Sequence, residues 1–380
     1  MRVAFVTAEF PPHTMGGAGV YAQKVTEGLA KRGHKVEVFA PACKSGEVSP
    51  GLNVFGINTG DRQKTVSFWR NLRKAVRSRE DTRGFDVVHV NGLSYHFLRR
   101  LSTTPQVLTV HHSALDAARV SGLGPVQRML RPGSEEGLIV PYLEKRAVSR
   151  CERIIAVSEF TRGRIVDLHG ADPSTITVIP NGVEPRPTDV REEEAIDMIP
   201  SSSGRPMVLF VGRLDDPRKG LDVLLRAFPR VAETTGARLV AVGKGDRSRV
   251  LQQAGHEAEA SITFTGFLTA DQLSSLYRQA DLCVVPSRLE GYGLTVAEAM
   301  QAGRTVVASR VGAIPEVLGD EEQLVAPNDP DALATKIISM LADDGLRMEV
   351  GRRNRARITA MPTWDDVAAL TEGVYRAVVR

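Results

Sequence analysis

Short apolar runs rich in β-branched residues recur along the chain and alternate with amphipathic helical patterns. They cover residues 2–8, 35–40, 85–90, 106–111 and 153–157 in the first half, and 206–211, 238–243, 262–266, 282–286 and 305–309 in the second. Because apolar residues in these runs do not alternate with polar ones, the pattern predicts strands covered on both faces by helices. The sequence therefore predicts an α/β protein with parallel sheets.

The segment 178–204, rich in Pro, Glu and Ser, interrupts this pattern, and we interpret it as a linker. A chain of 380 residues suits two domains of similar size, which we place at 1–185 and 186–363. Two doubly wound domains would bring the carboxyl ends of their strands around one cleft, and a tandem of independent domains is the alternative.

Composition and charge narrow the class of protein. With 42% hydrophobic and 25% charged residues, the chain does not fit a disordered, collagen-like or coiled-coil protein. The net charge of +4 gives no indication of a nucleic-acid partner. It is unevenly spread, because residues 1–190 hold 26 of the 49 basic side chains but only 18 of the 45 acidic ones. Three scattered cysteines, an amino terminus unlike a signal peptide and the lack of a membrane-length apolar run predict a cytoplasmic protein.

The first motif with chemical content begins at Gly16 and Gly17, where the sequence Gly-Ala-Gly-Val-Tyr-Ala matches G-x-G-x-x-A. A nicotinamide-binding turn would follow the first strand directly and would have an acid at the end of the second strand, and both features are missing. What the glycines still offer is backbone N–H groups at the start of a helix, which can bind an anion. A loop glycine needed only for positive φ is the alternative.

The second motif is a cationic loop, 211–222, between a predicted strand and a helix. It contains Arg213, Arg218 and Lys219. Positive charge beside a helix N-terminus suits a diphosphate, although such loops are often merely solvated.

The third motif places Glu290 before a predicted helix and Glu298 within it, separated by glycines. We expect both carboxylates to face one pocket and accept sugar or ribose hydroxyls, while the N–H groups of Gly293, Leu294 and Thr295 form a second anion site. A helix-capping role is the alternative for Glu290.

Taken together, these motifs resemble retaining glycosyltransferases of the GT-B architecture, the large family 4. Glu290 and Glu298 match the E-x7-E signature, residues 212–213 and 219–220 match V-G-R…K-G, and 16–17 match the amino-terminal Gly-Gly. Supporting matches are 157–158, 179–183, 264–266 and Trp364. The sequence of residues 215–220 is also similar to that of the corresponding loop in actinobacterial phosphatidylinositol mannosyltransferases.

The resemblance implies two Rossmann-like domains, with the last helix, 364–380, returning to the first. It implies that Gly17, Arg213 and Lys219 bind the donor diphosphate, that Leu268 lies beside the base, and that Glu298 holds the ribose. Glu290 and the histidine ending the fourth strand of the first domain would contact the sugar. His111 fits that position, with adjacent His112 as the alternative.

The activity implied is transfer of a hexosyl unit from a UDP- or GDP-linked sugar to an acceptor hydroxyl with retention of configuration. The nucleotide sugar is a co-substrate, and neither a metal nor another cofactor is expected, because cations and helix N-termini can neutralise the departing diphosphate. A silent sugar-nucleotide-binding protein and an NAD-dependent dehydrogenase are the alternatives. The D-x-D at 329–331 is interpreted as a helix cap rather than a metal site.

The sequence says less about the identity of the acceptor. Both a small molecule and a lipid-linked acceptor agree with it. Segment 61–83 holds eight basic and three acidic residues, with Val66, Trp69, Leu72 and Val76 near helical spacing. This pattern fits peripheral contact with an anionic membrane, or packing of the apolar residues on the sheet beneath a solvated basic face. We expect the loop 51–64 and the segment 116–136 to shape the acceptor site.

Overall fold

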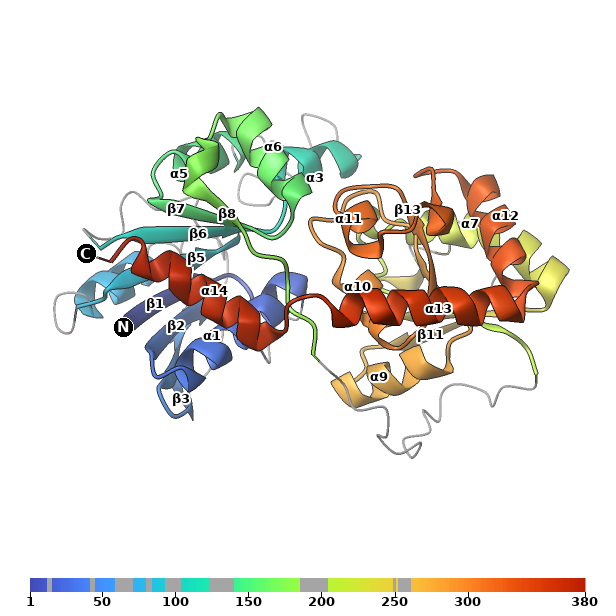
Figure 1. Cartoon of the computed structure of the whole chain (residues 1–380), viewed down its shortest axis with the longest axis horizontal. Coiled ribbons are helices and arrows are strands. Elements are labelled where there is room, and N and C mark those ends of the chain that lie inside the picture. Colours follow the sequence, from blue (N-terminus) through green and yellow to red (C-terminus); the bar gives the residue numbers. More distant parts are fainter. Residues whose placement is uncertain are drawn as a thin grey trace. The chain divides into compact units, whose positions relative to one another are not determined.

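The computed structural model describes residues 1–11, 16–41, 45–58, 71–79, 84–92, 104–122, 140–184, 204–248, 251 and 261–379. The chain forms two compact units (Figure 1). The first consists of Met1–Gly182 with Pro362–Arg380, and the second of Val183–Met361.

The first unit is built on a sheet that contains the five strands predicted for it, each within two residues of its expected bounds. They are β1 (Arg2–Thr7), β2 (Lys35–Pro41), β5 (Val87–Asn91), β6 (Gln106–Val110) and β7 (Arg153–Ala156). Three further strands, β3 (Gly46–Ser49), β4 (Leu52–Ile57) and β8 (Ile176–Val178), complete the order β3-β4-β2-β1-β5-β6-β7-β8. All pairs are parallel except β3 with β4.

Two predictions in this unit are wrong. The segment 51–64 was expected to be a loop, but it contains β4, whose Leu52, Val54 and Ile57 are buried. The predicted linker begins too early, because Val178 ends β8 and Ile179 is fully buried. Residues 185–203 of that linker lie outside the described part.

Helices cover both faces of the first sheet. On one face α1 (Gly17–Lys31) lies beside α14 (Trp364–Arg376), so the last helix belongs to the first unit (Figure 1). A Cβ added to Gly28 would come within 2.6 Å of the Cβ of Ala368, which shows how closely these helices approach. Further helices within the described ranges of this unit are α3 (Ala114–Val120), α5 (Val140–Val148), α6 (Glu159–His169) and the helical segment 71–79.

Segment 71–79 decides part of the membrane prediction. Leu72 and Val76 are fully buried in the hydrophobic core of the first unit, so they do not form an exposed apolar face. The alternative, packing beneath a solvated basic face, is therefore confirmed for these two residues, and Val66 and Trp69 lie outside the described part. No helix within the described ranges has both the length and the hydropathy needed to cross a bilayer.

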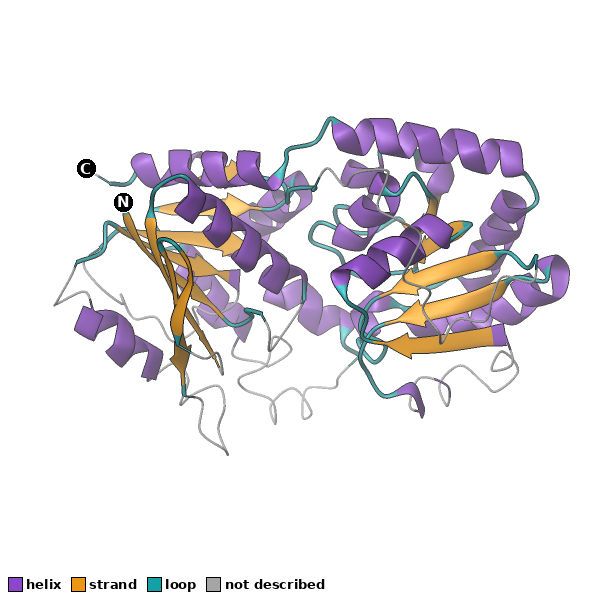
Figure 2. Cartoon of the chain, turned by 90° about the horizontal axis from the view of Figure 1, so that it is seen from below, coloured by secondary structure: helices purple, strands orange, loops and turns teal. Residues whose placement is uncertain are grey.

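The second unit contains the five strands predicted for it and one more. They are β9 (Met207–Val211), β10 (Arg238–Val242), β11 (Ile262–Gly266), β12 (Leu282–Val285), β13 (Thr305–Ser309) and β14 (Leu324–Val325). All are parallel in the order β11-β10-β9-β12-β13-β14, and helices surround them (Figure 2). The helices among its described residues are α7 (Leu221–Thr235), α9 (Ala270–Gln279), α10 (Leu294–Gln301), α11 (Ile314–Leu318), α12 (Pro330–Leu341) and α13 (Asp344–Thr359). Asp329 caps α12 by accepting from the N–H of Ala332 at 2.9 Å, which confirms the predicted role of the D-x-D.

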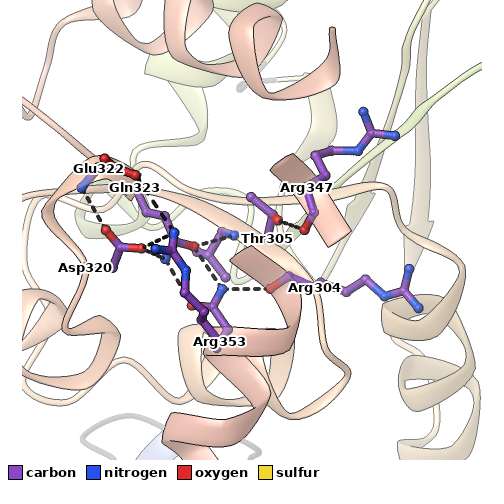
Figure 3. A network of polar contacts seen from close by, with 9 residues as sticks. Arg304, Thr305, Asp320, Glu322, Gln323, Arg347 and Arg353 are labelled. Atoms are coloured by element: carbon purple, nitrogen blue, oxygen red, sulfur yellow. Dashed lines mark hydrogen bonds and ion pairs between the residues drawn. The ribbon is translucent and has the colours of Figure 1, made fainter. Parts of the chain in front are cut away.

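A buried polar network fastens α13 to the amino end of β13 (Figure 3). Gln323 is fully buried, and its Oε1 accepts from the N–H of Val306 at 3.1 Å and from Nδ2 of Asn354 at 2.8 Å. Its Nε2 donates to Asp320 and to Asn354. Because each of these polar groups has partners, the network stabilises the end of the sheet opposite the loops described next.

Candidate functional site

Three loops at the carboxyl edge of the second sheet meet backbone to backbone. A Cβ added to Gly220, at φ 65°, would lie 2.0 Å from the carbonyl oxygen of Pro286. One added to Gly312, at φ 56°, would lie 1.9 Å from the carbonyl oxygen of Glu290. Only glycine fits both the left-handed backbone and the space. These contacts bring the loops after β9, β12 and β13 together.

This convergence pairs two side chains that the sequence placed in separate motifs. The Nζ of Lys219 lies 2.8 Å from Oε1 of Glu290, and Oγ of Ser287 donates to the same oxygen at 2.8 Å. Glu290 is buried, whereas 27% of the Lys219 side chain is exposed. The carboxylate is therefore held in one orientation, with a cation beside it that solvent or a ligand can reach.

The other two cations of the loop differ in their surroundings. The guanidinium of Arg218 binds both carboxylate oxygens of Asp216, with Nη2 2.8 Å from Oδ2 and Nε 3.0 Å from Oδ1. Burial opposes ionisation of Asp216, but its hydrogen bonds with Arg218 outweigh that effect and lower its pKa. Arg213 is exposed. Arg218 therefore stabilises the loop in this conformation.

Arg288 lies within the third motif, but no pattern in the sequence indicated a role for it. Its guanidinium binds both oxygens of Asp222, at 2.7 and 2.6 Å, and donates to the carbonyl oxygen of Pro217 at 2.7 Å. Its backbone N–H donates to the carbonyl oxygen of Arg218, also at 2.7 Å. Through these hydrogen bonds Arg288 connects the loop that contains Lys219 to the loop that contains Glu290.

Glu298 has a different partner from Glu290. The hydroxyl of Tyr277, a buried residue of α9, donates to Oε2 of Glu298 at 2.9 Å. No local signal marks Tyr277, because it lies 21 residues before Glu298. Gly293 precedes α10 at φ 97°, so Leu294 and Thr295 form the first turn, where backbone N–H groups have no acceptor within the helix.

Leu268 lies just beyond β11 and is buried. The neighbouring Phe267 is 57% exposed, with Nζ of Lys244 4.8 Å from the centre of its ring. This exposed aromatic residue was not predicted, and it stands at the same edge of the sheet as the loop after β10.

In the first unit, the glycine pair has a partner that the sequence did not indicate. The N–H of Gly16 donates to Oε2 of Glu9 at 3.1 Å, and a Cβ at Gly16 would lie 2.6 Å from the same oxygen. Gly17 begins α1, so its N–H and that of Ala18 lie in the first turn. The Gly16 N–H predicted to contact the donor is thus bound to a carboxylate in this conformation.

His111 lies just beyond β6, and its Nε2 is 2.8 Å from Oδ1 of Asn91 at the end of β5. The ring of Tyr21 meets the His111 ring edge-on, with centres 5.0 Å apart. His112 is half-buried beside it. Within the described part of the chain, no three His, Cys, Asp or Glu side chains form a group that could hold a metal ion.

The two Rossmann-like units are those of a GT-B type fold, and comparisons with known proteins identify the family. Residues 15–186 match the family model described as Glycosyltransferase Family 4, and residues 205–343 match that of the Glycosyl transferases group 1. The chain belongs to this glycosyltransferase family.

Two relatives and one solved structure cover nearly the whole chain. A phosphatidyl-myo-inositol mannosyltransferase of Mycolicibacterium smegmatis is 31% identical over 96% of this chain and 90% of its own. An uncharacterized glycosyltransferase of Methanocaldococcus jannaschii is 28% identical over 99% and 98%. The sucrose-phosphate synthase of Thermosynechococcus elongatus has a TM-score of 0.83 at 23% identity, covering 99% of this chain and 98% of its own, which shows the shared fold.

Proposed function

We propose that this glycosyltransferase moves a hexosyl unit from a UDP- or GDP-linked sugar to an acceptor hydroxyl, with retention of configuration and without a metal. The observation that carries the proposal is the Lys219–Glu290 pair, which sets a partly exposed cation against a buried carboxylate at a carboxyl edge of a parallel sheet. The roles of the remaining donor residues, among them Gly17, Arg213, Leu268 and Glu298, rest on the family resemblance.

The chemistry needs both charges of the pair. When the bond between the anomeric carbon and the diphosphate oxygen breaks, negative charge develops on the departing diphosphate and positive charge on the sugar. Lys219, Arg213 and the first-turn N–H groups of α10 would stabilise the diphosphate, and this supply of positive charge supports transfer without a metal. The carboxylate of Glu290 would stabilise the sugar cation.

Retention follows if the acceptor attacks the face that the diphosphate leaves. The acceptor oxygen then forms the new bond to the anomeric carbon, and its proton passes to the departing diphosphate oxygen. Glu290 is the nearest candidate nucleophile for the alternative path through a covalent intermediate.

A small or lipid-linked acceptor is proposed because one relative is a phosphatidyl-myo-inositol mannosyltransferase.

We further propose cytoplasmic action with peripheral contact at anionic lipid, supported by the exposed Lys74 and Arg77. The chain should then sediment with phosphatidylserine vesicles at low salt and be released at high salt. Equal sedimentation with neutral and anionic vesicles would contradict this contact.

The test of the activity begins with a thermal-shift screen of UDP- and GDP-linked hexoses. A true donor present at 100 times its Kd should add about 2.7 kcal/mol to the free energy of unfolding. Transfer is then assayed with inositol-type acceptors in the presence of a chelator, and NMR of the product reports the anomeric configuration. Donor binding with neither hydrolysis nor transfer would favour the silent-binding alternative, and an inverted product would overturn retention.

A further inference from the structure

We propose that Asn91 is a positioning residue that fixes the protonation of His111, so that His111 accepts a hydrogen bond from a hydroxyl of the transferred sugar. This inference rests on the proposed function, because it presumes that His111 contacts the donor. In this role His111 is a hydrogen-bond acceptor for the sugar and does not act as a cation that binds the diphosphate.

The orientation of the Asn91 amide is determined by its neighbours. The side-chain nitrogen lies 3.0 Å from the carbonyl oxygen of Ala18 and 3.1 Å from Oγ1 of Thr7. A backbone carbonyl can only accept, so the atom facing Ala18 must be the NH₂ group. The amide oxygen Oδ1 therefore faces His111, and at 2% exposure Asn91 has almost no contact with water.

The proton on His111 follows from that orientation. Oδ1 of Asn91 can only accept, and it lies 2.8 Å from Nε2, so Nε2 must carry a hydrogen. A neutral imidazole has one N–H, which leaves the lone pair on Nδ1. A ligand group that meets Nδ1 of the neutral ring must donate to it, as a sugar hydroxyl can and an ionised phosphate cannot.

Asn91 and Tyr21, which both contact the His111 ring, carry no charge near neutral pH. Asn91 is uncharged, so it lacks the stabilising effect that a carboxylate would have on an imidazolium. Burial raises the pKa of Tyr21, on α1, to about 12, so the ring packed on His111 is uncharged. Burial lowers the pKa of His89, on β5, to about 3, so that ring is also neutral. His112 is the adjacent titratable residue along the chain.

Asn91 also connects the histidine to the rest of the first-unit edge. It joins the end of β5 to Thr7 at the end of β1, to Ala18 in the first turn of α1 and to His111 beyond β6. Thr7 in turn donates to the carbonyl oxygen of Glu9 at 2.9 Å. One buried amide thus sets the histidine relative to the helix that begins at Gly17.

The direct test is NMR of the full chain with ¹⁵N-labelled histidine and no ligand, with His111 assigned by comparison with His111→Gln. We expect the neutral ring to carry its proton on Nε2, in slow exchange with water. A free imidazole also favours this form, so exchange protection is the decisive quantity. Asn91→Leu should speed this exchange about tenfold or more, because the hydrogen bond is lost. Thr109→Val, which removes the neighbouring hydrogen bonds to Tyr21 and His89, is the matched control and should leave the His111 exchange nearly unchanged.

Kinetics separate positioning from a merely structural role. Asn91→Leu should lower kcat about 10- to 100-fold with a smaller change in donor KM, since a misplaced ring costs most in the transition state. Asn91→Asp keeps an acceptor for Nε2 but stabilises the imidazolium, so it should raise the pKa of His111 by about 1 or more. Its activity should recover above that pKa, where the ring is neutral again, whereas Asn91→Leu should not recover at any pH.

A proton found on Nδ1, or equal and pH-independent defects in both Asn91 variants, would overturn the inference. The NMR measurement needs neither donor nor acceptor, so its outcome is independent of the proposed function. If the tautomer is as expected and no sugar is transferred, the proposed function fails instead.

Discussion

Lys219 and Glu290 lie 71 residues apart in the chain and 2.8 Å apart in the structure. For individual residues, this contact predicts that Lys219 and the adjacent Arg218 contribute unequally to catalysis. Lys219→Ala should lower kcat more than about 100-fold, the size expected when a contact to developing charge is lost. Arg218→Ala should cost less than about tenfold, because its guanidinium is bound to Asp216. Steady-state kinetics with a saturating donor would measure both.

Loss of stability must be separated from loss of catalysis here. Lys219→Ala leaves the buried carboxylate of Glu290 without its cation, and such changes destabilise proteins. The double variant Lys219→Met with Glu290→Gln removes both charges. Its unfolding midpoint should return most of the way from that of Lys219→Ala to that of the wild type, while the enzyme stays inactive. If turnover returned along with stability, neither residue would belong to the reaction.

At the element scale, α7 offers a matched pair of glycines at its two ends. Gly220 precedes the helix at φ 65° and Gly236 follows it at φ 69°. A Cβ at Gly236 would meet nothing within 4 Å, whereas one at Gly220 would lie 2.0 Å from the carbonyl oxygen of Pro286. Gly236→Ala should therefore cost only the left-handed backbone strain, about 1–2 kcal/mol in chemical denaturation.

Gly220→Ala should cost clearly more, because the loops after β9 and β12 must separate to admit the methyl group. That separation would move Lys219 from Glu290, so donor affinity should fall in Gly220→Ala and remain in Gly236→Ala. Titration calorimetry with the donor identified in the screen would measure this. Equal stability losses in the two variants would show that the loops do not pack as closely as described.

In the whole molecule, ion pairs link the last helix, α14, to the rest of the first unit. Glu372 of α14 lies 2.6 Å from Nε of Arg32 and 3.0 Å from Nε of Arg376, and hydrogen bonds from these two residues lower its pKa from 4.5 to about 2. A carboxyl whose folded pKa is depressed stabilises the fold above its unfolded pKa and loses that effect as pH falls through the folded value. The stabilisation should therefore be complete above about pH 5 and vanish near pH 2.

Comparison with Glu372→Gln isolates this contribution. The difference in unfolding free energy between the wild type and the variant should be largest near neutral pH and should shrink steadily between pH 5 and pH 2. Glu349→Gln, on the exposed surface of α13, is the control and should show a much weaker trend. A difference that stays constant with pH would mean that Glu372 acts by packing alone.

Ten of the strands could be predicted from local sequence alone, because buried parallel strands appear as short apolar runs without alternating polar residues. The sequence also determined the cap at Asp329, which is a local interaction. It missed β3, β4, β8 and β14, which are short or lie toward the sheet edges, where burial leaves a weaker pattern.

Which side chains meet depends on the packing of segments that are distant in the sequence. The sequence marked Lys219 and Glu290 separately, but their contact depends on glycines that let two loops approach to the distance of touching backbones. Tyr277 beside Glu298, Arg288 on Asp222 and Asn91 on His111 had no signal at all. Each of these pairs is 20 or more residues apart, and hydrogen-bond direction depends on the placement of whole strands rather than on spacing along the chain.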